Sequence, residues 1–241
     1  MEQRSLKSVP NTLALALLAS LCLQLAWQSS QPRPTAYAEE LVFPPDPKTL
    51  QALSLGEPIA LSQLMTLYLQ AFDNQPGISI PFRDLDYKRV ETWLARILEL
   101  DPVGQYPLLM ASHVYAQVAD AAKQRMMLEF VYRRFFEDPN RRWQWLAHAA
   151  IMAKHRLKDL PLALRYAQAI TKYATGPDVP HWASQMPIFI LEDMGELESA
   201  KILLGGLLVS GVVTDPHEIH LLTERLQDLE NEEKSSAPPK N

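Results

Sequence analysis

The chain has 241 residues, with 23 Lys and Arg against 28 Asp and Glu, and it contains a single cysteine. That cysteine, Cys22, lies in an apolar N-terminal segment, which excludes a disulfide framework or a cysteine-based zinc site in the residues that follow. The formal net charge of −5 argues against nucleic acid as a partner.

The N-terminal segment has the features of an export signal. Arg4 and Lys7 precede an uncharged stretch, residues 12–31, which we expect to span a bacterial-type inner membrane with the following domain in the periplasm. A second outcome stays open, because residues 36–38 (Ala-Tyr-Ala) resemble a signal-peptidase site, and cleavage near Ala38 would release the domain into the periplasm. A third interpretation is a buried helix in a cytoplasmic protein.

Four segments are predicted from composition. Residues 1–38 form the signal anchor or signal peptide, and residues 39–57 are rich in proline, so we expect an extended linker outside the core. Residues 58–233 form a helical repeat domain. Residues 234–241 are polar, and we expect them to be disordered.

Prolines punctuate the predicted domain at spacings of 37 to 39 residues, at Pro102, Pro139, Pro177 and Pro216. A fixed period in this range is typical of stacked helix-turn-helix units, each of which needs its neighbours to bury its apolar face. Apolar residues at helical spacing predict helices over residues 59–72 and 84–100.

The last helix is predicted to be a cap. Asp215 stands at the N-cap position, Pro216 at the first helical position and Glu218 where a capping box requires it. One apolar stripe faces the preceding pair, and the other side is polar, as a terminal repeat requires. The stripe consists of Ile219, Leu222, Leu226 and Leu229.

Residues 85–102, LDYKRVETWLARILELDP, resemble the second helix of a tetratricopeptide (TPR) repeat. Asp86-Tyr87 matches the usual turn pair, and Asp101-Pro102 closes the unit. The resemblance covers roughly residues 59–213. It implies an all-α fold, a TPR-like right-handed superhelix of stacked antiparallel helix pairs with a C-terminal capping helix. Because the period exceeds the family's 34 residues or so, we expect the additional residues in the turns within each pair.

The resemblance also identifies the positions that pack one helix on the next. His148 falls at one of them and is expected to be a hydrogen-bonded core histidine. The Gly205-Gly206 pair is interpreted as a site of close helix packing. The expected packing residues are Leu108, Ala111, Ser112, Tyr115, Trp145, His148, Ala149, Met152, Ala183, Met186, Pro187 and Ile190.

In TPR-like repeats the first helices line a concave groove that holds an extended peptide or tail. Transferring the groove positions predicts a lining of Tyr106, His113, Gln117, Trp143, Ala150, Lys154, His181, Gln185, Phe189 and Glu192. The alternative is that these aromatic side chains are buried against neighbouring repeats. A basic rim is expected from Arg133, Arg134, Arg141 and Arg142.

Charge is unevenly distributed along the chain. Residues 123–172 carry 11 Lys and Arg against 4 Asp and Glu, whereas both flanking regions are acidic. This basic middle is either an ordinary solvated surface or an anion-binding face. The second interpretation gives an alternative function, a soluble periplasmic binding module for an anionic small molecule or glycan.

We find no sequence motif of a nucleotide-binding loop, a hydrolase nucleophile or a zinc protease. His217 and His220 share a helix face with Glu224, but a solvated surface explains them better than a zinc site. We therefore expect no enzyme activity, no cofactor and no metal. The predicted function is a protein-interaction scaffold in the cell envelope.

Overall fold

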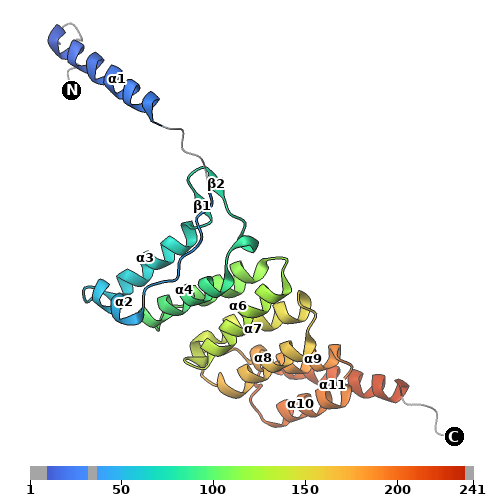
Figure 1. Cartoon of the computed structure of the whole chain (residues 1–241). Helices are drawn as coiled ribbons and strands as arrows, with labels where there is room; N and C mark the ends of the chain where they lie inside the picture. The colour runs from blue at the N-terminus through green and yellow to red at the C-terminus, as the bar shows by residue number, and fades with distance from the viewer. Residues whose placement is uncertain (1–9, 32–36, 237–241) are drawn as a thin grey trace. The chain divides into compact units, whose positions relative to one another are not determined.

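The structure, a computed structural model, describes residues 10–31 and 37–236 (Figure 1). Over these residues the protein is all-α, as predicted, with two strands of only two residues each. The elements are α1 (Asn11–Ser30), α2 (Pro47–Leu53), α3 (Pro58–Ala71), β1 (Asn74–Gln75), β2 (Ile78–Ser79), a 3₁₀ turn (Phe82–Asp84), α4 (Tyr87–Leu100), α5 (Tyr106–Leu109), a π-helical turn (Met110–Val114), a 3₁₀ turn (Tyr115–Gln117), α6 (Ala121–Phe135), α7 (Pro139–His155), α8 (Leu160–Tyr173), α9 (His181–Asp193), α10 (Leu197–Val209) and α11 (Pro216–Ser236). The predicted tail, residues 234–241, lies mostly outside the described residues.

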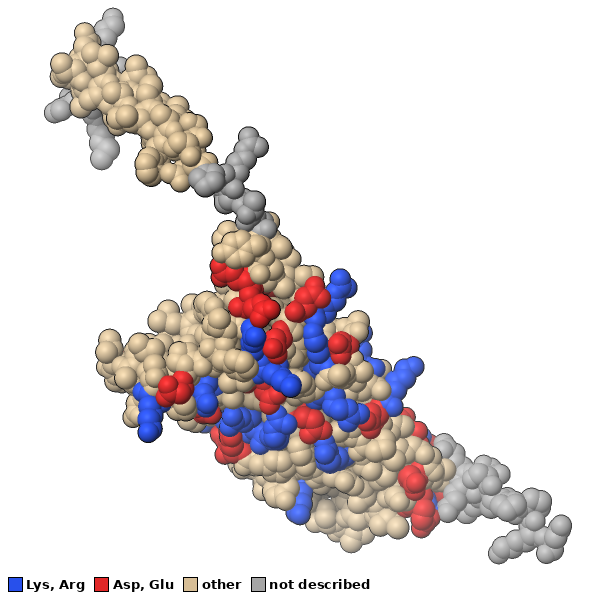
Figure 2. Space-filling model, viewed as in Figure 1, with Lys and Arg blue, Asp and Glu red and all other residues tan. Residues whose placement is uncertain are grey.

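The chain divides into two units, residues 1–38 with 76–78, and residues 39–75 with 79–241. In the first unit, α1 is a 20-residue helix whose side chains are all exposed. It carries no charged residue and is long and apolar enough to be a membrane span or a signal sequence (Figure 2). A helix of this length measures about 30 Å, which matches the hydrocarbon thickness of a bilayer.

Helix starts in the second unit follow ordinary capping chemistry. The carboxylates of Asp46, Asp86 and Asp120 each accept backbone N–H groups from the first turn of the helix that they precede. Asp159 accepts the N–H of Leu162 in the same way. These caps supply partners for N–H groups that a helix cannot satisfy itself, so the sequence fixes where α2, α4, α6 and α8 begin.

Consecutive helices pack on one another along the second unit: α3 on α4, α6 on α7, α7 on α8, α8 on α9, α9 on α10 and α10 on α11. We call α3, residues 106–117, α7 and α9 the first helices, and α4, α6, α8 and α10 the second helices. First helices also contact one another, since α7 touches both residues 106–117 and α9. The result is a repeat-like all-α fold.

The predicted packing positions agree largely with the core. Leu108, Ala111 and Ser112 are fully buried, as are Ala149 and Ala183. Trp145, Met186 and His148 are only partly buried. One large cluster of buried side chains extends from Leu41 to Ile190, and a smaller one joins α9, α10 and α11.

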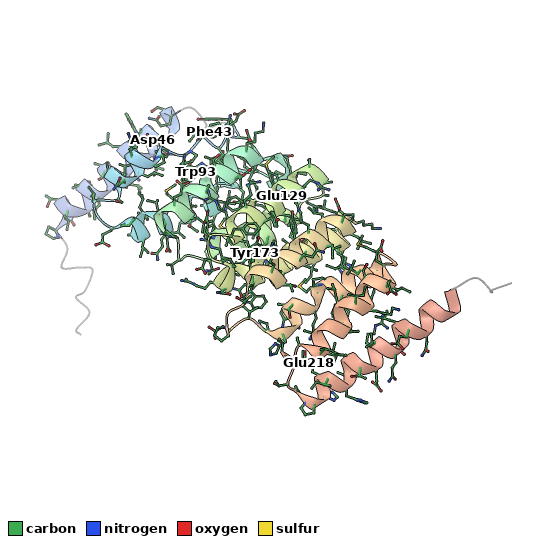
Figure 3. All side chains as sticks on the ribbon, turned by 90° about the horizontal axis from the view of Figure 1, so that it is seen from below. Phe43, Asp46, Trp93, Glu129, Tyr173 and Glu218 are labelled. Carbon is green, nitrogen blue, oxygen red and sulfur yellow. The ribbon has the colours of Figure 1, made fainter. Side chains whose placement is uncertain are left out.

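The segment predicted as an extended linker differs from that expectation. Within residues 39–57, α2 is helical, and Leu41 and Leu50 are buried in the large core cluster. Trp93 donates its indole N–H to the Val42 carbonyl at 2.7 Å, and Arg89 donates to the Leu41 carbonyl at 2.8 Å. Figure 3 labels Phe43, which lies within residues 39–57, and Trp93, which lies on α4. The apolar residues between the prolines therefore complete the α3–α4 core.

The first helix of the second pair is irregular. Residues 106–117 form one α-helical turn, then a π-helical turn, then a 3₁₀ turn. A π-helical turn leaves backbone groups displaced from the regular i→i−4 pattern and often marks a functional position. The TPR resemblance predicted which residues of this segment are buried but not this departure from α-helix.

In the last pair, the additional residues of the long period lie elsewhere than predicted. The turn within the last pair is short, residues 194–196, whereas the connection between α8 and α9 occupies residues 174–180. Gly205 and Gly206 also differ from expectation, because a Cβ added at either position would meet no atom within 4 Å. They lie on an open helix face and mark no close packing.

Helix α11 closes the last pair as predicted. Asp215 accepts the N–H of His217 at 2.8 Å, and Leu222 and Leu229 are buried against α9 and α10. Leu226 is partly buried in the same cluster, whereas Ile219 is exposed. Glu218 accepts a hydrogen bond from the Gln185 side chain on α9, so it links two helices.

Candidate functional site

The predicted groove residues occupy different environments on the first helices. Exposed members are Tyr106, His113, Gln117, His181 and Phe189. Partly buried members are Trp143, Lys154 and Glu192. Buried members are Ala150 and Gln185. We call the surface that carries the exposed and partly buried members the first-helix face.

One apolar feature of this face is a hollow of about 230 Å³ between α7 and α9. Its lining contains three of the predicted residues, Ala150, Lys154 and Phe189. The others are Ile151, His155, Trp182, Met186 and Ile190. Sequence reasoning placed His181 here and missed Trp182, because a shift of one residue rotates a helical side chain by roughly 100°.

Large apolar side chains around this hollow remain in contact with solvent. Trp182 is 50% exposed, Ile151 45% and Phe189 44%. Trp182 is held by an edge-to-face contact with Trp143, with ring centroids 5.3 Å apart. Such aromatic pairs fix ring orientation and leave an amphipathic edge available for a ligand.

One ion pair lies at the edge of this hollow. The Lys154 ammonium on α7 contacts the Asp193 carboxylate at the end of α9. His155, beside Lys154, is exposed. The edge is therefore polar, while the floor is apolar.

A second hollow of about 510 Å³ lies between α3 and the junction of α4 with α5. Tyr106, predicted from sequence, lies at its edge, where the Gln70 side chain on α3 hydrogen-bonds to its hydroxyl group. The remaining lining mixes hydroxyl, amide and apolar groups, from Ser62, Gln63, Thr66, Leu67, Ile97, Asp101, Gly104 and Pro107.

The part of the face around residues 106–117 and α7 is closed by direct contacts. The Trp145 indole donates to Gln105 at 2.6 Å, and the Gln117 amide contacts the Met152 sulfur at 3.8 Å. His113 stacks on His148, with ring centroids 3.5 Å apart. This closed region joins residues 106–117 to α7.

Two predicted groove residues are engaged by α11. Gln185 is buried and donates to Glu218, and Glu192 accepts from the Arg225 guanidinium at 2.7 Å. The capping helix thus covers the C-terminal end of the predicted groove lining. The sequence offered one indication of this contact, the acidic and basic residues on the polar side of α11.

The predicted basic rim is corrected at Arg142. Its side chain is buried and donates to the Glu137 carboxylate at 2.6 Å and to the Pro102 carbonyl at 2.8 Å. Burial alone would raise the pKa of Glu137, but hydrogen bonds from Arg134 and Arg142 outweigh it and hold that pKa below its usual value. Arg142 therefore joins α7 to the end of α4 and the end of α6.

The other arginines of the basic middle also bind acidic or polar partners. Arg133 pairs with Glu91, Arg134 with Glu137, and Arg141 with Asp138. Further pairs are Arg125 with Asp159 and Arg165 with Glu129. Figure 2 shows basic and acidic side chains interleaved on one face of the second unit. The segment thus has far less unpaired positive charge than its composition indicates.

Within the described residues, no cluster of three or more His, Cys, Asp or Glu side chains could hold a metal ion. The His220 Nε2 atom lies 3.5 Å from the Glu224 Oε1 atom on the exposed side of α11. Comparisons of the chain with protein-family models, with curated proteins and with solved structures gave no match.

Proposed function

We propose that this chain is an exported scaffold protein whose TPR-like right-handed superhelix binds a segment of a partner protein on the first-helix face. The observation that carries the proposal is the apolar hollow between α7 and α9. Three large side chains, Ile151, Trp182 and Phe189, surround it and are each about half exposed.

A partner that covers these three side chains would remove their apolar surface from water. Burying apolar surface is favourable by about 25 cal/mol per Å². Trp and other aromatic side chains in such settings are the residues that most often dominate binding energy. A volume of about 230 Å³ suits one bulky side chain of the partner.

The polar edge suggests what flanks that side chain. A partner carboxylate next to the apolar anchor would meet the Lys154 ammonium and the exposed His155. It would compete with Asp193 for the same cation. The segment we propose is therefore extended, with one bulky apolar residue and an acidic group or chain terminus beside it.

The N-terminal helix supports placement of the scaffold at a membrane. Helix α1 has the length and composition of a single span, and the sequence places Arg4 and Lys7 before it. We propose an inner-membrane tether with the repeat domain in the periplasm. Intact mass after native expression tests this, because a soluble chain that begins at Glu39 would contradict the tether and leave an exported soluble scaffold.

The binding proposal is tested with displayed random peptides selected on the full-length protein in detergent. We expect selected peptides to share a bulky apolar anchor and to lose at least tenfold in affinity for Phe189→Asp, about 1.4 kcal/mol. Ile202→Asp is the matched control, since Ile202 is an exposed apolar residue of α10. Equal binding by wild type and Phe189→Asp would contradict the proposal.

A further inference from the structure

Two histidines from separate segments are stacked on the first-helix face. His113 lies in the π-helical turn and His148 in the middle of α7. Their ring centroids are 3.5 Å apart, and the rings are 16° from parallel. Stacked rings direct their nitrogens sideways, so the two cannot converge on one metal ion, and the contact joins residues 106–117 to α7.

The neighbouring serine contacts one nitrogen of the His113 ring. The Ser112 hydroxyl donates its hydrogen to the Leu108 carbonyl at 2.8 Å. The same oxygen lies 2.8 Å from His113 Nδ1. Because the hydroxyl has only one hydrogen, both hydrogen bonds form together in the neutral tautomer of His113 that carries its proton on Nδ1.

His148 is placed as a neutral ring. Its Nε2 atom is buried and has no hydrogen-bond partner among the described residues. A proton at Nε2 would need an acceptor that the surroundings do not supply, and a buried unsatisfied donor is unfavourable. The sequence expectation was a hydrogen-bonded core histidine; His148 is half-buried and hydrogen-bonds with the Ser112 backbone, while its Nε2 atom has no partner among the described residues.

The groups around the His113 and His148 rings do little to stabilise a positive charge on them. Partial burial of the His113 ring lowers its pKa, although the residue as a whole remains exposed. Burial, and then the charge of His113, lower the pKa of His148, while a hydrogen bond with the Ser112 backbone acts weakly in the opposite direction. Trp145, the other ring in contact, does not titrate. Among the described residues, no carboxylate is a cause of the lowered pKa of either ring.

Charged side chains at the end of α7 are engaged elsewhere. Lys154 pairs with Asp193 on α9, and Arg156 hydrogen-bonds to the Gln117 side chain at 3.2 Å. Two positive charges on stacked rings would therefore repel one another with no carboxylate between them.

We propose that His113 and His148 form a pH-sensitive latch, closed when both rings are neutral and opened by protonation in mildly acidic medium. Opening ends the ring contact between residues 106–117 and α7, on the face that the proposed function assigns to partner binding. The contact lies where residues 106–117 depart from regular α-helix into π and 3₁₀ turns. The effect on a partner rests on the proposed function, whereas the latch itself does not.

The direction of the pH effect follows from the lowered pKa values of both rings. Histidine in an unfolded chain has a pKa of about 6.5. Above that pH both states are neutral and the stacked pair contributes fully to stability. As the pH falls below it, the unfolded chain takes up protons before the folded one, and stability declines.

The latch is tested on the full-length protein by melting temperature between about pH 7 and about pH 5, the range in which histidine changes charge. Wild type is expected to lose several degrees, and His148→Phe, which keeps a stacked ring but cannot be protonated, to lose much less. His217→Phe, on the exposed start of α11, is the matched control and should behave as wild type.

Histidine ring NMR on the wild-type protein gives a second test that needs no variant. Two of the ring signals should titrate clearly below the usual histidine midpoint and should respond to each other's titration. Equal pH dependence of melting in wild type and His148→Phe would overturn the latch. NMR titration midpoints at about pH 6.5 for both His113 and His148 would also overturn the latch. Neither readout involves a peptide, so failure of the binding proposal would be seen separately.

Discussion

The junction between α6 and α8 is sealed, whereas the equivalent junction between α8 and α10 is open. At the first, the Tyr132 and Tyr166 rings stack with centroids 5.1 Å apart, and the Tyr166 hydroxyl donates to Glu129 at 3.1 Å. Arg165 pairs with the same carboxylate. Figure 3 labels Glu129 among the packed side chains of the central helices.

The second junction has smaller side chains at the corresponding positions. Counted from the N-caps, Thr171 corresponds to Tyr132 and Leu203 to Tyr166. A hollow of about 320 Å³ lies there, lined by α8, α9 and α10. Both junctions join consecutive second helices, and the one with the stacked ring pair is closed, whereas the one with smaller side chains at those positions is open.

Removing the buried ring should have the largest effect. Tyr166→Ala deletes a side chain with no exposed surface, and such truncations cost about 3–5 kcal/mol of unfolding free energy. Leu203→Ala, at the corresponding open position, should cost about 1 kcal/mol or less, because Leu203 is 43% exposed. Urea denaturation of both variants measures the difference, and similar losses would contradict the comparison.

Removing the carboxylate should have an intermediate effect. Glu129→Ala leaves the Tyr166 hydroxyl without its acceptor, which should cost about 1–3 kcal/mol. Burial and then Glu129 raise the pKa of Tyr166, so this variant should also lower it. Gln168→Ala, at the corresponding exposed position of α8, should change stability by about 0.5 kcal/mol at most. Equal losses for the two would mean that the carboxylate does not support the sealed junction.

Adding a methyl group at the open junction should have the smallest effect, and a favourable one. Gly206→Ala places a Cβ in open space within a helix and should stabilise the protein by about 0.5–1 kcal/mol. Gly195→Ala is the contrasting variant, because Gly195 has a φ of +76° and alanine there should be destabilising. A loss of stability for Gly206→Ala would show that the α10 surface is more crowded than its geometry indicates.

The sequence predicted the helical framework well because its signals are local. Aspartate N-caps and periodic apolar residues define α4, α6 and α8, and they do so without reference to distant segments. The burial of Leu108, Ala111 and Ser112 was expected from the TPR resemblance, which identifies packing positions.

The sequence could not predict which residues from distant segments contact one another. Periodicity indicates that Arg142 lies on a helix but not that Glu137 and the Pro102 carbonyl bury it. His113 and His148 lie in different helical segments, so helical spacing along the sequence does not predict that their rings stack. The open setting of Gly206 likewise depends on small neighbours in α8 and α9.

The central claim is that the hollow between α7 and α9 binds a partner and the hollow between α8 and α10 does not. Both are apolar and open, so a photo-crosslinking residue placed in each distinguishes them directly in cells. With the photo-crosslinking residue at position 189 we expect a discrete adduct, and we expect to lose it in a chain that also carries Trp182→Ala. With the same residue at position 202 we expect no adduct. Adducts of equal yield from Phe189 and Ile202, or an adduct from Ile202 alone, would contradict the account.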